Sequence, residues 1–209
     1  MSKKDKSPYV EPDDINCQPF AYETTQVEDR KYGMKIFEGH IWPLISFCFT
    51  GNEEVLDLGC GTGRHSKFLS SFAKNITAID IAPSHIVKDK AGYDMRLIKD
   101  IPNVEYINAN FMNYDGQKKF DVVFIHSAFY YFYKCYQEDA FKKIISFLKS
   151  KNSLVVLIDG QENCRRPPLN PHQYDLHELS EKYNMECLVE EVKPQWGATG
   201  ARVSVLKLQ

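Results

Sequence analysis

The chain has 209 residues, of which 43% are hydrophobic and 26% charged, with a formal net charge of −2 and an isoelectric point near 6.3. This composition is typical of one globular domain with a core, and the small net charge argues against nucleic-acid or anionic-membrane partners, which require a basic face. No apolar run reaches the roughly 18 residues of a membrane span, and the first residues lack the apolar stretch of a signal peptide, which predicts a cytoplasmic protein.

The cysteines are scattered along the chain, and none belongs to a CxxC pair or a Cys/His cluster. Metal-binding sites usually show such spacing, so we expect no metal site. Reduced thiols are the simpler interpretation, and they agree with a cytoplasmic location. The cysteines are Cys17, Cys48, Cys60, Cys135, Cys164 and Cys187.

Three regions follow one another from the N-terminus. Residues 1–14 are polar and contain proline, which predicts a disordered arm. Residues 15–50 are expected to form a helical cap of one or two helices, broken near Gly39 and Pro43. Residues 51–209 would form the core of a single domain.

Short apolar runs rich in β-branched residues alternate with helical segments in this core. Strands separated by helices predict a parallel, doubly wound sheet with helices on both faces. The expected strands are 54–58, 75–80, 104–109, 120–126 and 154–159, and the expected helices are 64–73, 84–98 and 137–149.

The end of the chain has a different pattern. After a helix at about 173–183, two apolar runs at 185–194 and 201–209 are joined only by the segment "QWGATG". Such a short connection predicts an antiparallel hairpin that completes the sheet.

The stretch "VLDLGCGTGRHSKFLS" (55–70) predicts a buried strand, a glycine-rich turn and a helix. A dinucleotide fingerprint needs a third glycine where the helix packs on the strand, but Arg64 or Ser66 occupies that place. A phosphate-binding loop would need Gly-Lys-Ser/Thr, which is absent. The turn, with Asp57 beside it, therefore suits an uncharged or cationic ligand.

The segment "EVLDLGCGTGRHSKFL" resembles the first motif of the class I S-adenosylmethionine-dependent methyltransferases. The resemblance covers roughly residues 50–209, and the terminal hairpin fits that family's seven-stranded sheet. It implies S-adenosyl-L-methionine as the cofactor. In the family the glycine loop lies under the amino-acid part of the cofactor and the strand acid orients it, which assigns these roles to Gly59, Cys60, Gly61, Gly63 and Asp57.

Later landmarks of the family fall in order along the chain. Asp80 ends the second strand, where a carboxylate can accept both ribose hydroxyls, and Ile81 is expected against the adenine face. Asn110 stands where the family often has an acid that accepts from the adenine amino group, and Phe111 follows it. An amide oxygen can accept the same hydrogen bond.

The acceptor side is expected beyond the fourth and fifth strands. His126, Tyr130 and Tyr131 follow the fourth strand and would face the methyl group or the acceptor. His126 and Asp159, both at strand ends, are the two candidate general bases. The pair Arg165 and Arg166, in "CRRPPLNPH", is either solvated or holds an anionic acceptor, and the cap and the loop 160–173 are the expected lids.

We therefore expect methyl transfer to an O or N atom of a small molecule such as a sugar, phenol, amine or phosphorylated metabolite. No Asn/Asp-Pro-Pro-Tyr/Phe sequence follows the fourth strand and no Pro-Cys pair occurs, so the chain differs from methyltransferases that use those motifs. Two alternatives stay open: a non-catalytic S-adenosylmethionine-binding regulatory domain, and a nicotinamide-dependent oxidoreductase. The sequence fixes neither the acceptor nor the oligomeric state.

Overall fold

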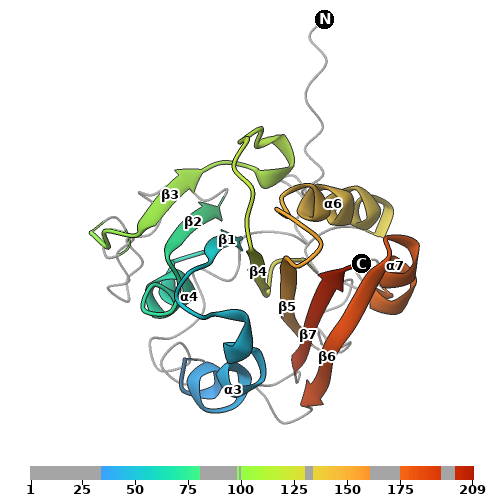
Figure 1. The fold of residues 1–209 in the computed structure, drawn as a ribbon, viewed down its shortest axis with the longest axis horizontal. Helices are drawn as coiled ribbons and strands as arrows, with labels where there is room; N and C mark the ends of the chain where they lie inside the picture. The colour runs from blue at the N-terminus through green and yellow to red at the C-terminus, as the bar shows by residue number, and fades with distance from the viewer. Residues whose placement is uncertain (1–33, 81–97, 99, 130–133, 161–174, 194–200) are drawn as a thin grey trace, which may run out of the picture.

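The fold is a seven-stranded sheet with helices packed on its faces (Figure 1). The structure, a computed structural model, describes residues 34–80, 98, 100–129, 134–160, 175–193 and 201–209. The strands are β1 Glu54–Leu58, β2 Asn75–Asp80, β3 Val104–Asn108, β4 Val122–His126, β5 Leu154–Gly160, β6 Met185–Lys193 and β7 Ala201–Leu208. The helical elements are η1 Phe37–Ile41, α3 Trp42–Ile45, η2 Ser46–Cys48, α4 Arg64–Leu69, η3 Phe111–Asn113, α6 Lys134–Ser146 and α7 Leu176–Lys182.

The strand order across the sheet is β3-β2-β1-β4-β5-β7-β6. The first five strands of the chain pair in parallel, and β7 runs antiparallel to both β5 and β6. The predicted parallel sheet with a C-terminal antiparallel hairpin is therefore confirmed. The predicted arm 1–14 and most of both the helix 84–98 and the loop 160–173 lie outside the described residues.

The central strands are mostly apolar because both of their faces are covered. Alternate residues of β4 and β5 enter two separate cores. Val122, Phe124, Val156 and Ile158 pack toward η1, α3 and α4, whereas their neighbours pack toward α6 and α7. Figure 1 shows these two groups of helices on opposite sides of the sheet.

The cap differs from the expectation of helices broken near Gly39 and Pro43. The helical path is continuous: one π-helical turn, η1, leads directly into α3. The Trp42 N–H donates to the carbonyl of Phe37, which is the wide i→i−5 bond. Pro43 directly follows this wide turn at the start of α3 and does not end the helical path.

The C-terminal helix begins later than the expected residue 173, because Asp175 caps it. The Asp175 carboxylate accepts from the backbone N–H of His177 at 2.9 Å and of Glu178 at 3.1 Å. Side-chain oxygens at this position satisfy N–H groups that have no partner inside the helix. No helix in the described part of the chain is long and apolar enough to cross a membrane.

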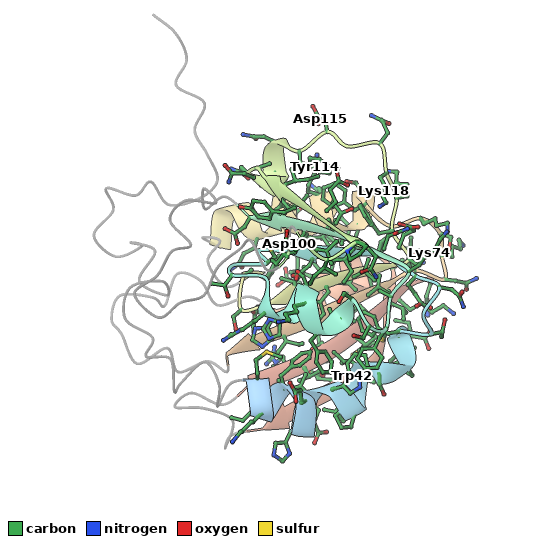
Figure 2. All side chains as sticks on the ribbon, turned by 90° about the vertical axis from the view of Figure 1, so that its left-hand side faces the viewer. Trp42, Lys74, Asp100, Tyr114, Asp115 and Lys118 are labelled. Carbon is green, nitrogen blue, oxygen red and sulfur yellow. The ribbon has the colours of Figure 1, made fainter. Side chains whose placement is uncertain are left out.

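The two edges of the sheet differ in their charges. At the amino ends of the strands, Glu54 forms ion pairs with Lys118 at 3.0 Å and Lys74 at 3.6 Å, and Asp121 pairs with Lys149 at 3.1 Å. Figure 2 shows Lys74 and Lys118 on the same side of the molecule. At the carboxyl ends, β1 lies between β2 and β4, which is where the strand order reverses and where such folds bind ligands.

Candidate functional site

The glycine loop after β1 has a backbone that favours glycine. Gly59, Gly61 and Gly63 have φ angles of +70°, +54° and +75°, in the left-handed region. The backbone N–H groups of Gly59 and Cys60 both donate to the carbonyl of Ile79, at 2.9 and 3.1 Å. The loop is thus fixed to the end of the neighbouring strand β2.

The same glycines allow close approach of other segments. A Cβ on Gly59 would lie 2.5 Å from the Cβ of Ala128, and a Cβ on Gly63 would overlap the side chain of Ile98. The loop therefore packs directly against the segment that follows β4. A molecule held by the loop must lie next to this segment.

Asp80 joins the loop to β2 through its side chain. Its Oδ2 accepts from the Gly61 N–H at 2.8 Å, and the residue is only 7% exposed. A carboxylate has about four acceptor positions, so it can accept from more than one donor at a time. The position fits the predicted contact with ribose, which stays a prediction.

Asp57 is the most buried acid of this edge, at 2% exposure. The Ser66 hydroxyl of α4 donates to its Oδ2. Burial raises the pKa of Asp57 to about 7, and the nearby charge of Asp80 adds to the rise, while the Ser66 hydrogen bond acts in the opposite direction. A cationic ligand beside Asp57 would favour its charged form.

Ser66 has a role that the sequence interpretation missed. In the sequence it is only a poor substitute for a packing glycine, yet it is fully buried and hydrogen-bonded to the strand acid. Its spacing of nine residues from Asp57 could not reveal this contact, because it depends on how α4 folds back over β1.

Three predicted cofactor residues also have structural roles. The Asn110 side-chain oxygen accepts from the Met112 N–H at 2.9 Å and so caps η3, and Phe111 packs into the core with Ile79. Cys60 is buried, and burial raises the pKa of its thiol well above the ordinary range, so the thiol is unreactive. Their contacts with the cofactor stay predictions.

The remaining predicted site residues lie outside the described part of the chain. They are Ile81, Tyr130, Tyr131, Arg165 and Arg166. Among the described residues, no group of three or more His, Cys, Asp and Glu side chains is arranged to hold a metal ion.

His126, at the end of β4, belongs to a stack of rings. Its ring centroid lies 4.1 Å from that of His65 in α4, and Phe37 of η1 contacts both, at 6.1 Å from His126 and 4.8 Å from His65. Burial and the guanidinium of Arg64 lower the pKa of His126 to about 3. His126 is therefore neutral at physiological pH. His65 was not among the predicted site residues.

The two candidate bases do not share a face of the sheet. His126 contacts Phe37 and Phe124 on the cap side. Asp159, which is 3% exposed, follows Ile158, a residue of the cap-side core, so strand alternation places it on the side of α6 and α7. The sequence placed both at one edge correctly but could not show that they point to opposite sides.

Comparisons with known proteins agree with this architecture. A profile described as "Methyltransferase domain" matches residues 55–151, which include β1, the glycine loop and β4. A curated relative, malonyl-[acyl-carrier protein] O-methyltransferase 2 of Ilyobacter polytropus, is 31% identical over 134 residues, or 61% of this chain and 48% of that protein. The chain is thus similar to methyltransferases over these residues. The matches support the resemblance to the class I S-adenosylmethionine-dependent methyltransferases and S-adenosyl-L-methionine as the cofactor.

Other proteins that this chain matches are also named as methyltransferases. Malonyl-[acyl-carrier protein] O-methyltransferase 1 of the same organism is 35% identical over 79 residues, or 36% of this chain and 27% of that protein. The chain thus spans about a quarter to a half of the length of these curated relatives. The N-methyltransferase NodS from Bradyrhizobium japonicum WM9, solved with S-adenosyl-L-homocysteine, has a TM-score of 0.65 at 16% identity, with 93% of each chain covered, and shows the shared methyltransferase fold.

Because the glycine loop is closely packed, one methyl group added to it should lower the stability of the protein. Gly63→Ala should destabilise the protein by roughly 1–3 kcal/mol, because the new Cβ meets Ile98 and the φ angle is left-handed. Gly39→Ala is the matched control, since a Cβ there has no atom within 4 Å. Urea unfolding of both variants measures the difference. Equal stability of the two variants would contradict the described loop.

The raised pKa of Asp57 predicts a pH-dependent gain in stability from Asp57→Asn. Below the ordinary value of 3.8 both folded and unfolded chains carry the proton, so the wild-type chain has no penalty there. As the pH rises to about 7 the unfolded chain releases the proton while the folded chain keeps it, and the wild type loses stability.

Asparagine does not titrate and can still accept from Ser66. The stability of Asp57→Asn relative to wild type should therefore rise by up to a few kcal/mol between pH 3.8 and about pH 7, and then level off. Urea unfolding across this pH range gives the measurement. Parallel stability curves for the two proteins would show that Asp57 is not held in its neutral form.

Proposed function

We propose that this chain transfers the methyl group of S-adenosylmethionine to an O or N atom of a small acceptor molecule. The observation that carries the proposal is the pair of buried acids, Asp57 and Asp80, at the switch point beside the glycine loop. S-adenosylmethionine carries groups that suit these acids: a cationic amino-acid end for Asp57 and two hydroxyls for Asp80. The fold and the family support the same cofactor.

Each residue of the edge would have a separate task. The glycine loop lets the backbone approach the amino-acid part of the cofactor, and Asp57 would favour its ammonium group in a poorly solvated place. Asp80 would orient the ribose while it holds Gly61. The cofactor supplies a sulfonium leaving group, so the protein mainly aligns the acceptor and excludes water.

His126 is a poor candidate for the general base. A base works best with a pKa near the working pH, and burial and Arg64 hold the pKa of His126 far below it. We therefore assign His126 to the wall of the site and keep Asp159 as the candidate base. An acceptor whose reacting atom carries no proton needs neither residue.

The class of acceptor is supported from two directions. The curated relatives are named as O-methyltransferases of a malonyl group on acyl-carrier protein, and NodS is named as an N-methyltransferase. Small carboxylates, phenols and amines are therefore the first acceptors to test, with an acyl group on a carrier protein as a further class. Nothing in the composition favours nucleic acid, and the cytoplasmic location stays a prediction.

Cofactor binding can be tested before an acceptor is known. Calorimetry should show micromolar binding of S-adenosylhomocysteine, and Asp80→Asn should weaken it by about 10- to 100-fold, because hydrogen bonds to a carboxylate contribute about 1.5–3 kcal/mol. Asp115→Asn is the control, since that carboxylate is 96% exposed on a surface loop. Equal affinity of both variants would remove Asp80 from the site.

Transfer itself is tested with a methyl-labelled cofactor and a panel of the acceptor classes named above. Label in an acceptor confirms catalysis. Tight cofactor binding with no transfer to any member of a broad panel would favour the binding-only regulatory domain instead.

A further inference from the structure

We propose that His65 is a positioning residue, which keeps His126 fixed and uncharged so that the two imidazoles form a neutral wall beside the cofactor's sulfonium. The inference rests on the proposed function, and it concerns a residue to which neither the family motif nor the comparisons assign a role. The two rings are 4.1 Å apart and inclined by 32°, which is a close, partly stacked contact.

The register of the sheet places this wall next to the glycine loop. Asp57 pairs with Phe124 and Leu58 with Ile125, so His126 lies level with the first residue of the loop. Gly59 in turn approaches Ala128, just beyond His126, so closely that a Cβ would not fit. The reacting end of a cofactor held by this loop therefore lies beside His126.

The elements packed around the pair oppose a proton on either ring. From α4, Arg64 brings a permanent positive charge and His65 a second imidazole; from η1, Phe37 brings an apolar ring. The other titratable groups of η1, Glu38 and His40, are exposed. Burial lowers the pKa of His65 well below its usual value as well, with further lowering from His126 and Arg64.

The nearby acids do not reverse this preference. Asp57 lies on the same face of β1, but burial raises its pKa to about 7, and its Oδ2 accepts from Ser66. Asp80 accepts from the Gly61 N–H of the loop. Burial and the nearby Arg64 lower the pKa of His126.

Neutrality of the pair matters because the two forms of the cofactor differ in charge at the sulfur. S-adenosylmethionine has a sulfonium and S-adenosylhomocysteine has a neutral thioether, while both have the same ammonium and ribose. A protonated His126 would repel the ammonium of both forms, but it would repel the sulfur centre only in S-adenosylmethionine, where that centre is a cation. The ratio of the two dissociation constants therefore reports the charge of the wall, and effects of Asp57 on the shared ammonium cancel in it.

The experiment has two parts, both on the full chain. NMR of the imidazole C–H groups in the wild type should show no titration of His65 or His126 between about pH 5 and pH 8. Calorimetry with both cofactor forms should give a ratio of dissociation constants that is constant over the same range. A ring that titrates with an ordinary midpoint, or a ratio that changes tenfold, would overturn the inference.

Two substitutions separate positioning from packing. His65→Ala opens the stack to water, so the pKa of His126 should rise, and binding of S-adenosylmethionine should weaken by about tenfold relative to S-adenosylhomocysteine at about pH 5 but not at about pH 8. His65→Phe keeps a neutral ring in place and should keep the wild-type ratio. A wild-type ratio in His65→Ala at both pH values, or the same change in both variants, would overturn the role of His65.

The outcomes also separate this inference from the proposed function. If neither cofactor form binds the wild type, the proposed function fails and the inference fails with it. If both bind but the imidazoles titrate normally, the inference alone fails. If His65→Ala does not fold, the titration of the wild-type imidazoles and the ratio of dissociation constants in His65→Phe still test the inference.

Discussion

The site depends on the attachment of the glycine loop to the end of β2. One carbonyl, that of Ile79, accepts from two successive N–H groups of the loop, and the carboxylate of Asp80 accepts from a third. This arrangement requires left-handed backbone at Gly59 and Gly61. It also brings Asp80 to within reach of Asp57, so that two acids share one poorly solvated edge.

The distribution of charge follows from that attachment. The acids at the amino edge of the sheet pair with lysines, which is a stable and ordinary solution for surface carboxylates. At the carboxyl edge, the partner of Asp57 is the Ser66 hydroxyl, and the uncharged ring stack of Phe37, His65 and His126 closes the cap side. An edge with buried acids and neutral rings suits a ligand that brings its own positive charge.

Most of the fold could be predicted from the sequence because the strands are buried on both faces. The runs at 54–58 and 75–80 match β1 and β2 at both ends, since apolar, β-branched stretches have sharp borders with polar turns. The predicted ends of the helices are less accurate. Helix α4 ends at Leu69 rather than at residue 73, and α7 begins at Leu176 rather than at about residue 173, because Asp175 caps it. Such limits depend on hydrogen bonds that hydrophobic spacing does not report.

The sequence predicts the part of the candidate site that lies within one motif. It does not predict contacts between segments that are distant along the chain. The loop glycines, Asp57 and Asp80 lie in or beside the motif that carries the family resemblance, and the structure places them at one edge of the sheet. The contact of His65 with His126 was missed because it joins the first turn of α4 to the end of β4, and Phe37 enters it from the cap. The sequence also does not show that Asp159 points away from His126. This orientation follows from strand alternation, once the residues of the two cores are known.

Hydrogen–deuterium exchange with and without S-adenosylhomocysteine tests the central claim most directly, because it maps the ligand on the chain without an acceptor. The account predicts slower exchange in the loop Gly59–Gly63, around Asp80 and in the segment after His126, with no change in the β6–β7 hairpin. Protection confined to other segments, or unchanged exchange in the glycine loop at saturating ligand, would contradict it.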